Sequence, residues 1–216
     1  MGERPKRFIF TGGGSGGHVS PALAVADKLK KKYPAADILY VGVKNKAEGI
    51  MVPKAGIPLK FVKSAPFPGR SPISVLRFAL TMMLGIIKAK LILLKFRPDV
   101  IFATGGYVSA PIVFTAWMLR KFTFGLINPK ILIHESNVHP GKMNKWAASM
   151  ADKVAVSFSE TINSLPKGKG FFSGYPVRSS ISVINREQAR ADLGINENGF
   201  VIFAFGGSQG ARAINR

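Results

Sequence analysis

Runs of apolar residues alternate along the chain with polar and helix-forming segments. Eight short runs are rich in β-branched and aromatic residues, which favours buried strands. We predict strands at residues 7–11, 37–42, 59–62, 99–104, 130–135, 153–158, 169–174 and 200–205. Helix-like stretches separate most of these runs, as is typical of parallel strands joined by helical crossovers. The pattern predicts an α/β fold with a doubly wound, mostly parallel, Rossmann-like sheet.

The last apolar run repeats the pattern with which the chain opens. Residues 200–216, FVIFAFGGSQGARAINR, read as a strand, a glycine turn and a helix start, and a polar helix that ends at Gly194 precedes them. We predict a complete N-terminal domain at 1–178, a linker with a polar helix at 179–198, and the start of a second Rossmann-like domain at 199–216. Because one strand and a short helix cannot bury a core, we expect this second domain to be truncated.

The first strand runs into a glycine loop, GGGSGG, at residues 12–17. The helix after it is predicted to have Ser20 as its N-cap, Pro21 as its first residue and its end at Tyr33. Backbone N–H groups at the start of such a helix can hold a phosphate or a developing anion. His18 stands beside these groups, and an ordinary histidine pKa of ~6.5 suits a general base.

Two nucleotide-binding alternatives compete for this loop. It fits the dinucleotide pattern G-x-G-x-x-G, but the second strand ends in YVGVKNK without the acidic residue that holds a ribose diol. This disfavours hydride transfer. His18 and Val19 stand where a P-loop has Lys and Ser or Thr, which disfavours triphosphate hydrolysis.

Two later strands also end in candidate ligand-binding residues. In open α/β sheets, ligands bind at the carboxyl ends of strands. After the strand at 130–135, Glu135, Asn137 and Asn144 offer a carboxylate and amides to sugar hydroxyls. After the strand at 99–104, TGGY at 104–107 is a second candidate anion or sugar site.

Charge and hydropathy add a candidate surface to this fold. Lys and Arg number 31 against 11 Asp and Glu, a net charge of +20 that attracts anionic partners. No acidic residue occurs between Glu48 and Asp99, and within that stretch residues 73–96 predict a long apolar helix. Its longest uncharged run has ten residues, 78–87, whereas a membrane span needs about 20. We predict partial insertion into an anionic membrane surface.

Several other classes are disfavoured. The chain has no cysteine, and His134 and His139 are too far apart for a zincin helix, so we predict no metal site. We also expect no nucleic-acid partner, because no recognition module is present and the basic residues accompany an apolar helix instead of stacking aromatics. We expect no signal peptide at the N-terminus, because its basic residues lead directly into a short predicted strand.

Six motifs, in this order, resemble the MurG family of glycosyltransferases. They are GGGSGGHVSPALAVA, VPKAGIPL, ATGGYVSAP, HESN, GYPVR and GGSQGAR, and the match runs from Phe8 to Arg216. The resemblance implies a two-domain GT-B enzyme of peptidoglycan synthesis on the cytoplasmic face of the bacterial plasma membrane. Its reaction is the inverting transfer of N-acetylglucosamine from UDP-GlcNAc to the C4 hydroxyl of undecaprenyl-pyrophosphoryl-MurNAc-pentapeptide, lipid I to lipid II, without a cofactor.

The resemblance also implies residue roles. His18 is the leading general base and Glu135 a weaker candidate. The donor-binding residues are Ser15, Gly16, Gly17, Asn137, Arg178 and Ser208. The acceptor-binding residues are Thr104, Gly105, Gly106, Tyr107 and Asn144. The membrane-associating residues are Ile73, Leu76, Phe78, Leu80, Met83, Leu84 and Ile87.

The chain departs from the family pattern at two positions. Ser136 stands where Gln is usual, and Tyr175 where Asn is usual. In this family, the residues that read uracil and ribose would follow Arg216, so we expect residues 1–216 alone to have little or no transferase activity. A membrane-anchoring, acceptor-binding subunit of a split glycosyltransferase is the alternative interpretation.

Overall fold

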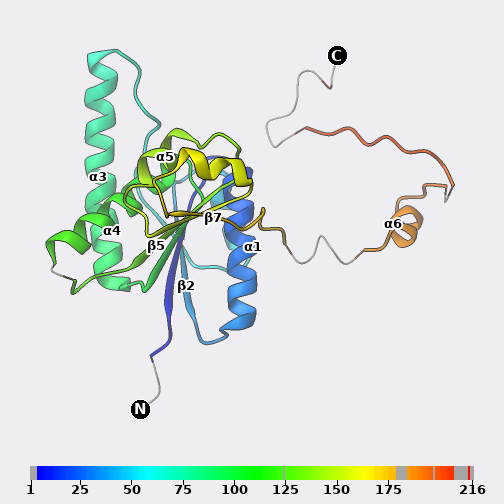
Figure 1. Ribbon diagram of the computed structural model, residues 1–216, viewed down its shortest axis with the longest axis horizontal. Coiled ribbons are helices and arrows are strands. Elements are labelled where there is room, and N and C mark those ends of the chain that lie inside the picture. Colours follow the sequence, from blue (N-terminus) through cyan, green and yellow to red (C-terminus); the bar gives the residue numbers. More distant parts are fainter. Residues whose placement is uncertain (1–3, 124, 179–183, 197, 207–213, 215–216) are drawn as a thin grey trace.

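A single parallel sheet organises the chain (Figure 1). The computed structural model describes residues 4–123, 125–178, 184–196, 198–206 and 214. The strands are β1 (Arg7–Thr11), β2 (Asp37–Gly42), β3 (Leu59–Phe61), β4 (Val100–Ala103), β5 (Lys130–Glu135), β6 (Lys153–Val156) and β7 (Gly170–Phe172). All neighbouring pairs are parallel, in the order β3-β2-β1-β4-β5-β6-β7. Seven of the eight predicted strands are confirmed, to within two residues at each end.

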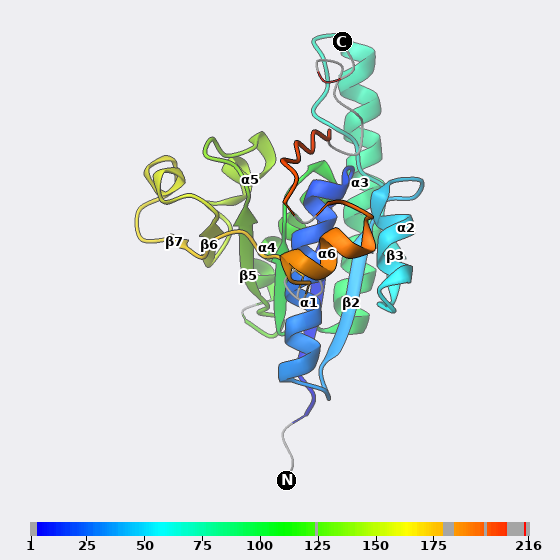
Figure 2. The same cartoon turned by 90° about the vertical axis from the view of Figure 1, so that its right-hand side faces the viewer.

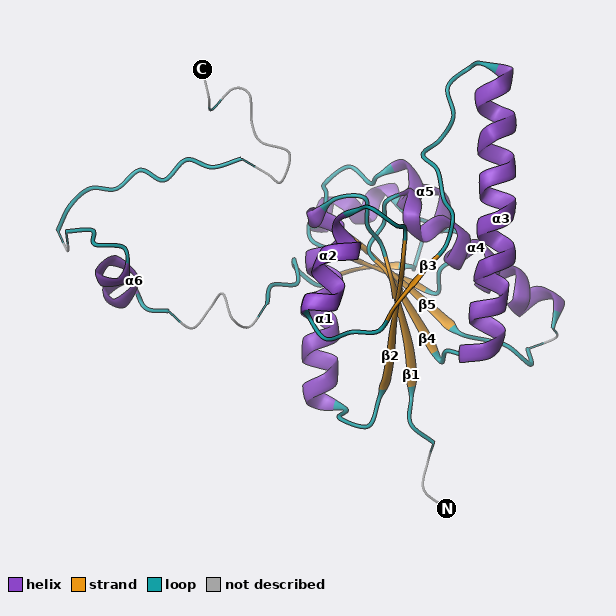
Figure 3. Ribbon diagram, turned by 180° about the vertical axis from the view of Figure 1, so that it is seen from behind, coloured by secondary structure: helices purple, strands orange, loops and turns teal. Residues whose placement is uncertain are grey.

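Helices cover both faces of the sheet. They are α1 (Gly16–Lys32), α2 (Ala47–Lys54), α3 (Pro72–Phe96), α4 (Ala110–Phe122), α5 (Lys142–Ala147) and α6 (Arg186–Asp192), with 3₁₀ turns η1 (Tyr107–Ser109) and η2 (Ser159–Ser164). Because successive strand side chains point to opposite faces, Phe8 and Phe10 pack toward α1 and Ile9 packs toward the other face. Helices α1 and α2 lie side by side over one face (Figure 2), and α3 and α4 cover the opposite one (Figure 3).

The two halves of α3 have different surroundings. Gly85, Ala89, Ile92 and Leu93 are buried, and a Cβ at Gly85 would overlap the carbonyl oxygen of Lys63. The C-terminal half therefore packs closely on the domain, while the N-terminal half projects beyond it (Figure 1). The predicted long apolar helix is confirmed.

The start of α1 differs from the sequence-based prediction. The helix begins at Gly16 with Ser15 as N-cap, so Pro21 lies inside it. Proline lacks the N–H that would bond the Gly17 carbonyl, and the Tyr175 hydroxyl donates to that oxygen instead, at 3.4 Å. Two hydrogen bonds between His18 and Thr104 fix this early turn of the helix. The predicted end at Tyr33 is confirmed.

The segment beyond the sheet forms only part of the predicted structure. Helix α6 is capped by Asn185, whose side-chain oxygen accepts from the Gln188 N–H at 2.8 Å, and Gly194 follows it with φ of 63°. The strand predicted at 200–205 is wrong, because residues 198–206 contain no strand and Phe200 is 93% exposed. A strand needs a neighbour for its backbone groups, and none pairs with these residues in the described part of the chain. The three-part domain division stays a prediction.

Candidate active site

Two glycine-rich loops meet where the sheet changes winding direction. The loop at 12–17 follows β1 and the turn at 104–107 follows the adjacent strand β4, at the switch point where open α/β sheets bind ligands. Gly106 has a φ of 71°, and a Cβ there would overlap the carbonyl oxygen of Gly13. A Cβ at Gly12 would overlap the Thr104 hydroxyl. The glycines therefore let the two loops interlock.

His18 joins these loops from the first turn of α1. Its Nδ1 lies 2.9 Å from the Thr104 carbonyl oxygen, and the Thr104 hydroxyl donates to the His18 carbonyl at 2.6 Å. Because a carbonyl only accepts, this geometry assigns the proton to Nδ1 and leaves the lone pair on Nε2. Nε2 has no hydrogen-bond partner among the described residues. The arrangement suits proton abstraction by Nε2.

The other residues of the two loops differ in accessibility. Gly16 and Gly17 open α1, where the first N–H groups have no acceptor within the helix. The Ser15 side chain makes no capping bond to these groups. Gly106 and Tyr107 are half-buried, whereas Thr104 and Gly105 are buried. Direct contact of the Thr104 side chain with an acceptor is therefore not supported, since its hydroxyl is engaged with His18.

Glu135 is saturated with hydrogen bonds. Its Oε1 accepts from the backbone and side-chain N–H groups of Asn137, at 2.9 and 2.8 Å. Its Oε2 accepts from Gly141 N and Asn144 Nδ2, each at 2.9 Å. The residue is 1% exposed. The role of Glu135 as a second candidate base stays a prediction, and its buried oxygens, which hold a loop through four hydrogen bonds, argue against it.

Asn144 belongs to the same buried network. Its Nδ2 also donates to the His134 carbonyl at 3.2 Å, and its Oδ1 is buried without a hydrogen-bond partner. The Asn144 side chain lies against Gly105, so it supports the turn at 104–107 from the interior of the domain. Its predicted direct contact with the acceptor stays a prediction, and the burial of its side chain favours the supporting role. Asn137, by contrast, is exposed.

Tyr175 and His134 connect the end of the sheet to α1. The imidazole of His134 is 1% exposed, with Nε2 3.3 Å from the Gly174 carbonyl and its ring 6.1 Å from that of Tyr175. Burial lowers the pKa of His134, against smaller opposing effects of Gly174 and Glu135. Arg178, predicted to bind the donor, is exposed, and Ser208 lies outside the described residues.

Sequence reasoning missed Glu48. This residue is fully buried in α2, and its carboxylate accepts from Gly14 N and Val43 N, each at 3.0 Å. A Cβ at Gly13 would lie within 2.6 Å of its Oε1. Glu48 thus ties the glycine loop to the loop after β2. Burial, and secondarily Glu48, raise the pKa of Tyr40, whose hydroxyl donates to the Gly12 carbonyl at 2.7 Å.

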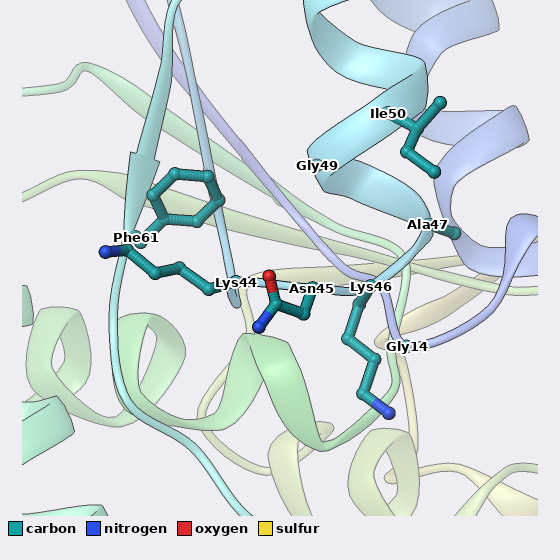
Figure 4. Close-up of a pocket in the computed structure, with 8 residues that line it drawn as sticks. All are labelled: Gly14, Lys44, Asn45, Lys46, Ala47, Gly49, Ile50 and Phe61. Atoms are coloured by element: carbon teal, nitrogen blue, oxygen red, sulfur yellow. The ribbon is translucent and has the colours of Figure 1, made fainter.

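A pocket opens beside the two loops that Glu48 joins. It has a volume of about 680 Å³ and extends from Gly14 past Lys44, Asn45 and Lys46 to Phe61 (Figure 4). In the figure, Lys44 reaches toward Phe61 and Lys46 toward the side of Gly14. The glycine loop therefore borders a basic pocket.

The predicted membrane-associating residues lie on α3. Six of the seven are exposed, from 44% for Leu84 to 77% for Ile73. Phe78 differs, because it is half-buried and its ring stacks on Phe67 with centroids 6.1 Å apart. No helix in the described ranges is long and apolar enough to span a bilayer.

The sequence pattern of the glycosyltransferase family 28 N-terminal domain matches residues 8–156. The chain belongs to this family. It is 40% identical over 212 residues to the UDP-N-acetylglucosamine--N-acetylmuramyl-(pentapeptide) pyrophosphoryl-undecaprenol N-acetylglucosamine transferase of Desulforudis audaxviator, covering 97% of this chain and 54% of the relative. The transferase of the same name from Halalkalibacterium halodurans is 36% identical, with coverage of 97% and 55%. The chain thus spans about half the length of these relatives.

Two solved structures share the fold of this chain. The crystal structure of Acinetobacter baumannii MurG superposes with a TM-score of 0.64 and 23% identity, covering 81% of this chain and 46% of that one. The glycotransferase of kitacinnamycin gives a TM-score of 0.53 with 13% identity, covering 80% and 52%. The expectations of a MurG-like family and of a Rossmann-like GT-B domain are confirmed. At these identities the structures bear on fold alone.

Proposed function

We propose that this chain forms the acceptor-binding part of an inverting N-acetylglucosaminyltransferase that converts lipid I to lipid II. The observation that carries the proposal is Nε2 of His18, which has no hydrogen-bond partner among the described residues and lies where two interlocked glycine loops meet at the switch point. The 40% identical relative is named for transfer to a lipid-linked muramyl pentapeptide, which supplies the substrate classes.

The chemistry needs one proton transfer and one displacement. The C4 hydroxyl of the muramyl sugar attacks the anomeric carbon of UDP-GlcNAc, His18 Nε2 takes the hydroxyl proton, and UDP leaves with the electrons of the broken glycosidic bond. Inversion follows from a single attack opposite the leaving group. No step uses a cofactor or metal.

Binding roles follow from the accessible loop residues. The N–H groups at Gly16 and Gly17, with Ser15, Asn137 and Arg178, would contact the donor. From its place in the GGSQGAR motif, Ser208 would also contact the donor. For the acceptor, the half-buried Gly106 and Tyr107 at the start of η1 would face its pyrophosphate, while Thr104, Gly105 and Asn144 hold that turn in place.

Transfer by the full-length gene product tests the proposal. Incubation with UDP-GlcNAc and a short-chain lipid I analogue should yield the disaccharide product, detected by mass spectrometry. An acceptor lacking only the C4 hydroxyl should bind but give no product. Absence of transfer to the intact acceptor by folded protein would reject the assignment, and acceptor binding alone would favour the split-subunit alternative.

The exposed α3 surface should place the protein on the cytoplasmic membrane face as a peripheral protein. Leu76 and Leu80 are 62% and 50% exposed beside basic residues, which suits anionic lipid. We expect the double change Leu76→Glu and Leu80→Glu to abolish most flotation with anionic vesicles. Leu126→Glu with Leu193→Glu, at residues 91% and 72% exposed outside α3, is the matched control. Equal flotation of both variants would refute docking through α3.

A further inference from the structure

Two adjoining pockets form one groove that starts at the glycine loop. The pocket at Gly14 reaches Lys44 and Phe61, and a second pocket of about 560 Å³ continues from these residues to Lys63 and to Lys88 on α3. Phe61, Val62 and Leu84 contribute apolar surface along the way. We call this combined surface the lysine groove.

The groove is basic without compensating acids. Lys44, Lys46, Lys63 and Lys88 are exposed, and none of them forms an ion pair within the described part of the chain. Glu48 is the acidic residue nearest in sequence to the loop at 43–46 that lines the groove. It is buried, and its carboxylate accepts from two backbone N–H groups. The exposed charge of the groove is therefore positive and matches an anionic ligand.

The wall of the groove is held in place before any ligand arrives. Asn45 adopts φ of 60°, a left-handed conformation that asparagine adopts more readily than most other residues with a side chain. It separates Lys44 and Lys46, which extend to different sides (Figure 4). One carboxylate, that of Glu48, bonds both this loop and the glycine loop. Preorganisation of this kind lowers the entropy cost of binding.

We propose that the lysine groove binds the peptide stem of the acceptor through its carboxylates. This inference rests on the proposed function. In a muramyl sugar the peptide is attached through O3, next to the reacting C4 hydroxyl. The pyrophosphate is attached at C1, on the opposite side of the ring. If the C4 hydroxyl lies at His18, the peptide starts beside the glycine loop, because Gly13 and the His18 ring both lie against Gly106. The lysine groove begins at Gly14.

The lining suits such a stem, whose five extended residues span at most about 18 Å. A pentapeptide has its terminal carboxylate and any acidic side chains to pair with lysines, and its apolar side chains can contact Phe61 and Leu84. Lysine is suited to this work because its flexible ammonium pairs with carboxylates in several geometries.

The test compares two acceptor analogues, one with the pentapeptide and one ending at the lactyl group. We expect the full-length gene product to bind the peptide-bearing analogue more tightly. The triple variant Lys44→Gln, Lys63→Gln and Lys88→Gln should lose that preference, on the order of 10-fold, and raise KM with little change in kcat. The variant Lys28→Gln, Lys32→Gln and Lys167→Gln removes the same charge from exposed sites outside the groove and should keep the preference.

The outcomes separate this inference from the proposed function. Transfer to both analogues with equal KM in the unmodified protein would refute peptide binding and leave the transferase assignment intact. Reduced flotation of the groove variant with an unchanged peptide preference would assign the lysines to membrane lipid and also refute it. Failure of both analogues to bind or react would reject the proposed function and this inference together.

Discussion

Replacement of His18 by alanine is expected to lower kcat for transfer by about 10²–10⁴-fold, the usual contribution of a general base. The physical reason is that Nε2 has no other hydrogen-bond partner in the described residues, while Nδ1 is fixed by the Thr104 carbonyl at 2.9 Å. The KM for the acceptor should change little, because proton abstraction is an interaction of the transition state. Initial rates with the lipid I analogue measure both constants.

A second substitution separates proton transfer from positioning. His18→Asn keeps an N–H donor near the position of Nδ1 but has no basic nitrogen at the position of Nε2. We expect it to be as inactive as His18→Ala. His139→Ala, at an exposed histidine on a neighbouring loop, should retain activity. If His18→Asn restored near-normal turnover, His18 would be a positioning residue and not the base.

The sheet and its switch point could be predicted from sequence because they depend on local patterns. Apolar runs identify strands, and glycine loops after β1 and β4 identify the ligand-binding edge. The start of α1 could not be predicted in the same way. The Thr104 carbonyl accepts from the His18 ring, and the Thr104 hydroxyl donates to the His18 carbonyl. This long-range contact holds the helix in place from Gly16, whereas the local signals of Ser20 and Pro21 predict a later start.

The roles of the two buried glutamates also depend on how the neighbouring loops fold around them. Glu135 ends a strand at the ligand-binding edge, as a catalytic carboxylate would, yet four N–H groups occupy its oxygens. Glu48 lies on an apparently ordinary helix, and its importance becomes visible only when the loops at Gly14 and Val43 are placed around it. Sequence indicates which residue types are present, whereas the fold decides which donors they meet.

Glu48→Ala is accordingly expected to be among the most destabilising single changes in the chain. It leaves the N–H groups of Gly14 and Val43 without their acceptor. Hydrogen bonds to charged groups contribute about 1.5–3 kcal/mol each, so loss of these two part-buried bonds should lower the free energy of unfolding by about 3–6 kcal/mol. Urea denaturation followed by circular dichroism measures this change. Glu160→Ala, at an exposed glutamate on η2, should stay within about 0.5 kcal/mol of the unmodified chain.

The substitution Glu48→Gln tests whether both oxygens are needed as acceptors. A glutamine places its NH₂ group against one of the two N–H donors, so the similar shape of the side chain does not preserve both hydrogen bonds. Stability should therefore fall between that of the unmodified protein and that of Glu48→Ala. Because the same carboxylate fixes the glycine loop and the wall of the lysine groove, folded Glu48→Gln protein should also bind the peptide-bearing acceptor more weakly. Unchanged stability in both variants would show that the two loops hold their positions without Glu48.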